Sequence, residues 1–238
     1  MKLDEIGIIL TPTFRAMAYL QKLTKNKIYP NFAIIMNSKD KNIFSSIIKE
    51  NEMNFFDKFK DFKSVLKTFS IPYKEVTAED CNNAKIVKIL KQRNEKFFIY
   101  TGGGILKEEI LDIGKKFIHV HPGIVPEYRG STCIYYSIIN EDKCGATAFF
   151  MSKKIDTGDI IAKKSFKKPN TPNIDYEYDA YIRSSLLTTI IKKYIKLGKF
   201  ISKPQNLNKG ETYFIIHPVL KHLAILSCIK YEKNQNIS

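Results

Sequence analysis

Short apolar runs along this chain alternate with segments in which apolar residues recur every three or four positions. The short runs occupy residues 6–10, 31–36, 71–76, 97–101 and 116–121. The periodic segments occupy residues 14–25, 55–69, 84–93 and 132–140. Buried strands produce the first pattern and amphipathic helices the second, so the alternation predicts an α/β fold in which crossover helices cover a mostly parallel sheet. We expect residues 97–101 to form the central strand.

Turn and cap residues refine these boundaries. Thr13 is a fair N-cap for the helix predicted over residues 14–25. Residues 145–151 and 160–165 predict an antiparallel hairpin that closes the unit, and its turn contains residues 156–159.

The character of the sequence changes after residue 168. Two prolines and two asparagines form a linker-like stretch, and beyond it we expect a helix over residues 176–197, a short strand over 210–216 and a frayed tail over 232–238. We therefore divide the chain into an α/β domain over residues 1–168 and a small helical or mixed C-terminal appendage over 169–238.

Composition places the chain among ordered globular proteins. Its 238 residues are 44% hydrophobic and 12% aromatic. The longest apolar stretches, such as residues 222–229, fall short of the roughly 20 residues that a membrane span needs, and the N-terminus has no signal-peptide pattern. We expect a soluble cytoplasmic protein with no membrane partner.

Charge and cysteine content say less about function. The formal charge of +15, from 39 basic and 24 acidic residues, favours anionic ligands such as nucleic acid or a nucleotide-linked substrate, although scattered lysines are also typical of a solvated surface. The four cysteines contain no C-x-x-C pair, which argues against a zinc knuckle and favours reduced thiols.

Two histidines stand close together at the end of a predicted strand. Side chains alternate along a strand, so His119 and His121 share one face, opposite that of Val120. Pro122 and Gly123 then end the strand, which places His121 at the carboxyl edge of the sheet. Open α/β folds hold their ligands at that edge, so the pair is a candidate for catalysis.

Three motifs together resemble the 10-formyltetrahydrofolate-dependent formyltransferases. They are the His-Pro-Gly-x-x-Pro-x-Tyr-Arg-Gly run over residues 121–130, the Gly-Ala-Thr of residues 145–147, and the Ile-Asp-Thr-Gly-Asp-Ile of residues 155–160. The family includes methionyl-tRNA, glycinamide ribonucleotide and nucleotide-linked amino-sugar formyltransferases. The resemblance implies a Rossmann-like formyltransferase domain over residues 1–168 that uses 10-formyltetrahydrofolate as co-substrate; similarity after residue 170 is poor.

The family's catalytic set consists of an asparagine, a histidine and an aspartate. The resemblance assigns the last two roles to His121 and Asp156, and it places His119 where the family has asparagine. It implies that His121 handles protons, that Asp156 orients His121 and takes up the amine proton, and that His119 stabilises the oxyanion. An amide is a fixed donor, whereas an imidazole donates only in the right tautomer or when protonated.

A glycine-rich loop follows the predicted central strand. It is not a dinucleotide fingerprint, because Lys107 occupies the position of the third glycine. Glycines let a ligand approach the backbone, and the resemblance implies that this loop lines the slot for the pterin ring. The expected cofactor-binding residues are Thr101, Gly102, Gly103, Gly104, Ile105 and Leu106.

The acceptor is expected to be a small-molecule primary amine, in the first place that of a nucleotide-linked amino sugar. Tyr128, Arg129 and Gly130 are the expected substrate-binding residues, with Arg129 and nearby lysines available to a diphosphate. The residues after 168 leave little room for the β-barrel of methionyl-tRNA formyltransferases. The net charge of +15 keeps tRNA as the alternative acceptor, and a homodimer is left open.

Three other interpretations carry less weight. An H-x-H metallohydrolase site would need further ligands, and only His217 and His222 remain, so we expect no metal. Asp156-Thr157-Gly158 also spells the aspartic-protease triplet, but a second triplet is missing from the sequence. Because the family's asparagine is replaced, a non-catalytic member that binds folate or an anionic polymer stays open.

Overall fold

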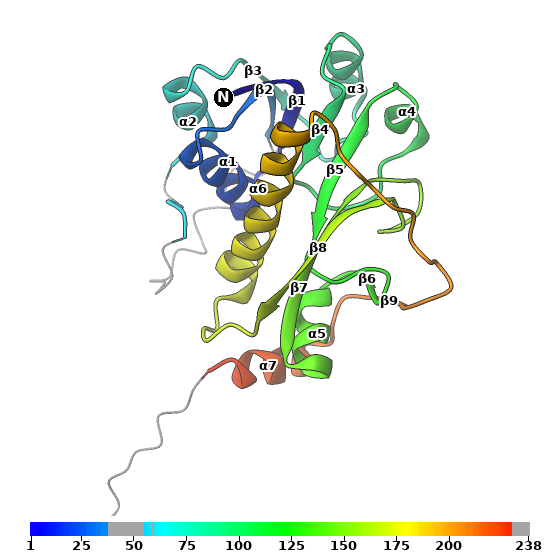
Figure 1. Cartoon of the computed structure of the whole chain (residues 1–238). Helices are drawn as coiled ribbons and strands as arrows, with labels where there is room; N and C mark the ends of the chain where they lie inside the picture. Colours follow the sequence, from blue (N-terminus) through cyan, green and yellow to red (C-terminus); the bar gives the residue numbers. More distant parts are fainter. Residues whose placement is uncertain (38–54, 59, 230–238) are drawn as a thin grey trace, which may run out of the picture.

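A seven-stranded sheet forms the centre of the protein, which we describe from a computed structural model (Figure 1). The strand order is β3-β2-β1-β4-β5-β7-β8. The strands span Lys2–Leu10 (β1), Tyr29–Asn37 (β2), Tyr73–Thr77 (β3), Phe97–Tyr100 (β4), Lys116–His121 (β5), Lys143–Phe150 (β7) and Ile160–Lys167 (β8). The first five are parallel, whereas β7 runs antiparallel to β5 and β8 antiparallel to β7. The predicted mostly parallel sheet with β4 at its centre is confirmed.

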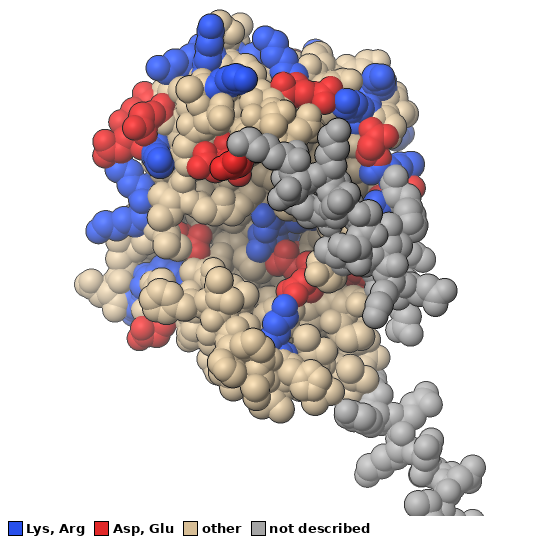
Figure 2. Space-filling view, turned by 180° about the vertical axis from the view of Figure 1, so that it is seen from behind, with Lys and Arg blue, Asp and Glu red and all other residues tan. Residues whose placement is uncertain are grey.

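The structure describes residues 1–37, 55–58 and 60–229. The tail predicted over residues 232–238 lies outside this part of the chain. Within it, no helix is both long enough and apolar enough to cross a membrane. On the face shown in Figure 2, Lys and Arg side chains are interspersed with Asp and Glu.

Helices cover both faces of the sheet. They span Phe14–Lys25 (α1), Phe62–Thr68 (α2), Ala84–Lys91 (α3), Glu108–Leu111 (α4), Cys133–Glu141 (α5), Asp179–Leu197 (α6) and Pro218–Ser227 (α7), and a π-helical turn over Ile174–Tyr178 precedes α6. Helices α1 and α6 lie on one side of the sheet and α3 and α4 on the other (Figure 1). This layering buries both faces of the central strands.

Capping residues set where the N-terminal helices begin. The Oγ1 of Thr13 accepts the amide N–H of Ala16 at 3.2 Å, so the predicted N-cap of α1 is confirmed. The helix predicted over residues 55–69 is shorter than expected. The carboxylate of Asp61 accepts the amide N–H of Ser64 at 2.9 Å, and α2 therefore begins at Phe62.

Strand β5 alternates between two cores, as its sequence predicts. Ile118 and Val120 belong to the core beneath α1 and α6. Phe117 packs in the second core, with residues of α3 and α4. His119 and His121 share the face of Phe117 and continue it to the carboxyl end of the strand.

Helix α6 is part of the main core, although it follows the boundary expected at residue 168. Leu186, Leu187 and Ile190 are buried together with Leu20 of α1 in one hydrophobic cluster. The division into 1–168 and 169–238 therefore does not separate two cores. On this face α6 packs beside α1 and helps to cover the sheet, and the linker-like residues lead the chain back to that position.

The segment after α6 returns across the molecule to the carboxyl edge of the sheet (Figure 1). Lys203 forms an antiparallel bridge with Ile160 of β8. Strand β9 (Glu211–Tyr213) then pairs in parallel with β6 (Tyr128–Gly130), which makes a separate two-stranded sheet. The strand expected over residues 210–216 is thus present but shorter, and it contacts the His-Pro-Gly motif region.

Shortening a buried side chain of α6 should destabilise the whole protein if α6 and the sheet share one core. Leu187 is fully buried, so Leu187→Ala should lower the free energy of unfolding by about 2–5 kcal/mol in a single transition. Urea unfolding followed by far- and near-UV circular dichroism measures both properties. The exposed Thr189→Ala on the same helix is the control. Two separate transitions in the wild-type protein would contradict a shared core.

Candidate active site

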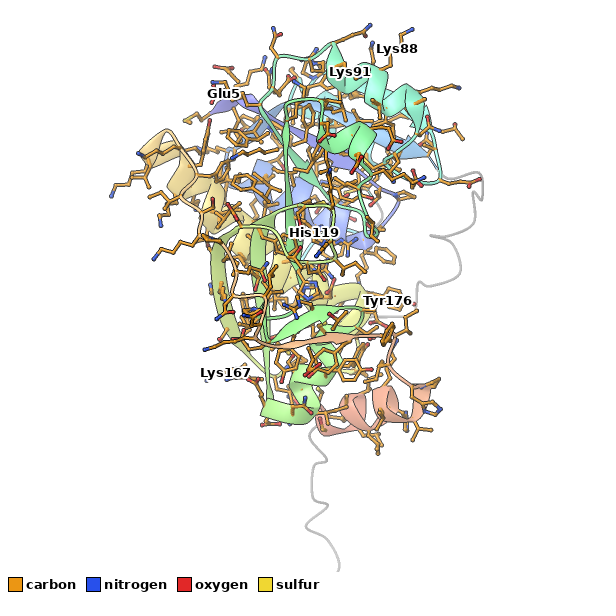
Figure 3. All side chains as sticks on the ribbon, turned by 90° about the vertical axis from the view of Figure 1, so that its right-hand side faces the viewer. Glu5, Lys88, Lys91, His119, Lys167 and Tyr176 are labelled. Atoms are coloured by element: carbon orange, nitrogen blue, oxygen red, sulfur yellow. The ribbon has the colours of Figure 1, made fainter. Side chains whose placement is uncertain are left out.

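A cavity of about 480 Å³ opens at the carboxyl edge of the sheet. The residues that line it come from distant parts of the sequence: Arg15 from α1, Gly103, Gly104 and Ile105 from the loop after β4, His119 and His121 from β5, Asp156 from the turn between β7 and β8, and Arg183 from α6. Tyr213, Phe214 and Ile215 of the C-terminal segment complete its wall. His119 lies in the middle of the molecule, where these elements converge (Figure 3). The structure therefore brings all three predicted catalytic residues into one cavity.

The ring of His121 lies between two hydrogen-bond acceptors. Its Nε2 is 2.9 Å from the carbonyl oxygen of Tyr128, and its Nδ1 is 3.3 Å from Oδ2 of Asp156. A carbonyl oxygen can only accept, so Nε2 carries a proton, and Nδ1 faces the carboxylate. A hydrogen bond between Nδ1 and Oδ2 requires one more proton on either atom. The pair is thus arranged to hold a single proton inside the cavity.

The backbone fixes the carboxylate of Asp156 in this position. Asp156 adopts a left-handed conformation with φ of +51°, and its Oδ2 also accepts the amide N–H of Gly130 at 2.8 Å. The side-chain amide of Gln205 donates to the carbonyl oxygens of Asp156 and Gly158, at 2.8 and 2.7 Å. A Cβ at Gly158 would lie 1.6 Å from the carbonyl oxygen of Phe150, so only glycine fits there. The turn is therefore held from both sides.

His119 is buried, and its surroundings disfavour the protonated ring. Burial, together with the positive charges of Arg183 and Arg15, holds the pKa of His119 well below its ordinary value of 6.5. Its Nδ1 lies 3.3 Å from the carbonyl oxygen of Tyr100 and must donate to it, which leaves Nε2 as an acceptor on the cavity side. The oxyanion-donor role expected for His119 therefore does not fit this tautomer. Burial also lowers the pKa of His121, and the charge of Asp156 acts in the opposite direction.

Sequence reasoning missed two arginines that line the cavity. The Nε–H of Arg15 donates to the carbonyl oxygen of Thr101 at 2.6 Å, and the Nε–H of Arg183 donates to Asp179 at 2.9 Å. Burial lowers the pKa of Arg15 to about 10, so it stays charged at neutral pH. A usable signal was present in the composition, because only four of the 39 basic residues are arginines.

Half of the predicted glycine-rich loop lines the cavity. Gly103, Gly104 and Ile105 do so, and a Cβ on either of these glycines would meet no atom within 4 Å. The other three residues position the loop. Thr101 and Leu106 are buried, and Gly102 packs against the ring of Tyr100, where a Cβ would lie 2.4 Å from ring atoms.

The three residues of the Tyr-Arg-Gly run make different contacts. Tyr128 supplies the carbonyl oxygen opposite His121, and Gly130 lines the cavity. Arg129 lines an adjoining groove of about 420 Å³ together with Lys153 and Lys154. The Nη2 of Arg129 donates to the carbonyl oxygen of Gly210, whereas its Nη1 is buried and has no hydrogen-bond partner in the described part of the chain.

The remaining histidines lie elsewhere. His217 caps α7 by accepting the amide N–H of Val219, and His222 is exposed on the same helix. Among the residues that the structure describes, no group of three His, Cys, Asp or Glu side chains is placed to hold a metal ion.

Comparison with known proteins gives a consistent family. The family model described as formyl transferase matches residues 12–172. The methionyl-tRNA formyltransferase of Finegoldia magna is 28% identical over 208 residues, which cover 81% of this chain and 66% of that protein. The chain spans about half to two thirds of the length of the curated relatives that it matches first.

Solved structures share the fold. A sugar N-formyltransferase from Shewanella sp. superimposes with a TM-score of 0.59 at 16% identity, over 98% of this chain and 92% of that one. WlaRD, a sugar 3N-formyltransferase solved with dTDP and 5-N-formyl-THF, gives a TM-score of 0.59 at 18% identity, over 97% and 81% of the two chains. At these identities the likeness concerns the fold alone.

Neutral buried histidines should make stability depend on pH. Below pH 6.5 the unfolded chain binds a proton at residue 119 that the folded chain does not bind, so stability should fall by about 1.4 kcal/mol per pH unit for this residue. The lowered pKa of His121 likewise makes stability fall as the pH falls. Urea unfolding at pH 7.5 and 5.5 should show a smaller decline in His119→Asn than in the wild type. His222→Gln, at an exposed position, is the control. An unchanged decline in His119→Asn would show that His119 is not held neutral.

Proposed function

This chain belongs to the formyl transferase family, and from that premise we propose that it transfers a formyl group from 10-formyltetrahydrofolate to a primary amine, in the first place that of a nucleotide-linked amino sugar. Enzymes of the family use 10-formyltetrahydrofolate as their formyl donor. The observation that carries the proposal is the cavity itself, in which His121 and Asp156 meet at hydrogen-bond distance beside an open glycine loop.

The His121–Asp156 pair suits the proton that this reaction releases. A primary amine attacks as the neutral base, and the new C–N bond makes its nitrogen an ammonium that must lose a proton. Nδ1 of His121 and Oδ2 of Asp156 share a gap of 3.3 Å that one proton would bridge. General acid-base groups of this kind are effective when their pKa lies near the working pH. Burial lowers the pKa of His121, and the charge of Asp156 raises it back toward that range.

The glycine loop fits a flat donor molecule. Gly103 and Gly104 present bare backbone to the cavity, and neither position is crowded by a neighbour. A volume of about 480 Å³ lies within the usual range of roughly 300–1,000 Å³ for small-molecule sites. These residues would hold the folate's ring system, which carries the formyl group into the cavity.

Two features favour a nucleotide-linked acceptor. Arg129, Lys153 and Lys154 line the adjoining groove; Lys153 is paired with Glu108, and the remaining positive charge suits a diphosphate. Phe214 is 84% exposed at the rim of the cavity, so its ring offers a face on which a base can stack. Structural relatives named as sugar N-formyltransferases make such an acceptor a natural first candidate.

Methionyl-tRNA is the second candidate. It is favoured by the name of the relative from Finegoldia magna and by the net charge of +15. Steady-state formylation assays with both acceptor classes and 10-formyltetrahydrofolate, read by the mass gain of one formyl group, separate the two. We expect turnover with a nucleotide-linked amino sugar. Robust formylation of aminoacylated initiator tRNA would reverse this ranking, and folate binding without any transfer would favour a non-catalytic family member.

Removing either member of the proton-accepting pair should nearly abolish turnover. His121→Ala and Asp156→Asn should each lower kcat by about 10²- to 10⁴-fold, because each removes the acceptor of the amine proton. Asp159→Asn is the matched control, since Asp159 is an exposed carboxylate in the same turn that does not line the cavity. Near-normal kcat in either cavity variant, with the fold verified by circular dichroism, would remove that residue from the mechanism.

Shortening Phe214 should weaken binding of a nucleotide-linked acceptor without affecting chemistry. Loss of one base-aromatic stack of about 1–3 kcal/mol predicts a rise in KM of roughly 5- to 150-fold for Phe214→Ala, with little change in kcat. Leu223→Ala removes another exposed apolar side chain, on α7 and outside the cavity, and should leave both constants unchanged. An unaltered KM in Phe214→Ala would exclude the stacking role.

A further inference from the structure

Arginine is scarce in this chain and is concentrated at the candidate site. Of the four arginines, Arg93 forms a two-pronged ion pair with Glu95, through contacts of 3.0 and 2.6 Å. The other three, Arg15, Arg129 and Arg183, line the cavity or the groove beside it. Elsewhere the chain uses lysine, so these positions are places where a planar guanidinium with several fixed donors is of use.

Arg15 is anchored by one donor and presents the others to the cavity. It lies in the first turn of α1, and its Nε–H is held by the carbonyl oxygen of Thr101 at 2.6 Å. Thr101 is itself fully buried and donates its hydroxyl to the carbonyl oxygen of Ile9 at 2.9 Å. Among the described residues this is the one hydrogen bond that the Arg15 side chain makes, so its Nη groups remain available, and the side chain lines the cavity.

The neighbouring His119 lacks the donor that an amide would provide at its position. Its Nδ1–H is directed to Tyr100, and its Nε2 is an acceptor. Protonation of the ring would restore a donor, but burial of the ring and the charges of Arg183 and Arg15 lower its pKa and oppose it. An amide both accepts and donates, so the two functions of one asparagine have to be divided between two side chains here.

We propose that Arg15 donates the hydrogen bond that stabilises the oxyanion in this enzyme, and that His119 is a hydrogen-bond acceptor in the same cavity. This assignment rests on the proposed formyl transfer. As the amine nitrogen forms its bond to the formyl carbon, the carbonyl electron pair moves onto the formyl oxygen, and an Nη–H of Arg15 donates to that oxygen. The amine proton passes to the His121–Asp156 pair. When the electron pair returns, the bond from the formyl carbon to the folate nitrogen breaks, and that nitrogen takes up the proton that the His121–Asp156 pair received from the amine.

The anchoring partner of each guanidinium favours Arg15 over Arg183 for this role. The Nε–H of Arg183 is paired with the carboxylate of Asp179, which offsets its charge, whereas the Nε–H of Arg15 is held by a neutral backbone carbonyl, that of Thr101. A cation also lowers the energy of an anion that forms only in the transition state. Arg183 adds to the positive potential without a donor assigned to the reacting atoms.

The assignment predicts a loss in kcat that an asparagine at residue 119 repairs. Arg15→Ala should lower kcat by about 10²- to 10³-fold with KM for both substrates little changed. His119→Asn should retain substantial activity, and the double variant Arg15→Ala/His119→Asn should regain about 10-fold or more over Arg15→Ala, because the amide again supplies a donor. Added guanidinium ion should partly restore Arg15→Ala. Lys25→Gln, which removes an exposed cation from the same helix, is the control and should behave as the wild type.

Three results would overturn the assignment. Normal kcat with a raised KM in Arg15→Ala would make Arg15 an anchor for a substrate anion, and failure of His119→Asn to improve Arg15→Ala would break the link between the two positions. Should Arg15→Ala not fold, Arg15→Lys keeps the charge but lacks the planar guanidinium with its several donors, and kcat should still fall by about 10-fold or more. Full activity of Arg15→Lys would count against the proposal. A wild-type protein that formylates no amine would instead refute the proposed function, and the role of Arg15 with it.

Discussion

Two acceptors face the ring of His121 from opposite sides, and the arrangement of the site depends on this constraint. The carbonyl oxygen of Tyr128 fixes a proton on Nε2, so the contact between Nδ1 and Asp156 needs one further proton. Both acceptors are held by chain that follows residue 168. Gln205 holds the turn of Asp156, and β9 pairs with the strand that contains Tyr128. The C-terminal segment is therefore a structural component of the candidate site, because it fixes the atoms that define the proton's place.

Charge in the cavity is divided in a way that suits acyl transfer to an amine. Arg15 and Arg183 bring positive charge to the cavity, and burial together with this charge lowers the pKa of His119. Asp156 brings the negative charge that a proton from the amine can neutralise. A site with fixed cations and a separate proton acceptor can stabilise a negative oxygen while it removes a proton from nitrogen.

The sequence was most informative where local patterns decide structure. Strand β5 has the predicted bounds, Thr13 caps α1 as expected, and the alternation along β5 placed His119 and His121 on one face. The start of α2 was missed because Asp61 caps a shorter helix than apolar periodicity alone suggests. The boundary at residue 168 followed from linker-like residues, which do not reveal that α6 returns to pack on α1.

Long-range contacts decide the features that the sequence could not supply. An arginine in the first turn of α1 is most simply a surface residue, and only the fold brings Arg15 next to the end of β4 and into the cavity. The tautomer of His119 likewise depends on one backbone carbonyl, that of Tyr100, which is 19 residues away. Motif resemblance named residue 119 as the oxyanion position, whereas the hydrogen bond decides which chemistry that residue can perform.

Nitrogen-15 NMR of the histidine rings tests the central claim most directly, because it reports which ring nitrogen carries a proton. At pH 7 we expect His119 as a neutral ring protonated at Nδ1, and His121 with a proton on Nε2. Assignment by single His→Gln variants identifies each ring. A doubly protonated His119, or a His119 protonated at Nε2, would contradict the hydrogen-bond arrangement on which the division of roles between His119, His121 and Arg15 depends.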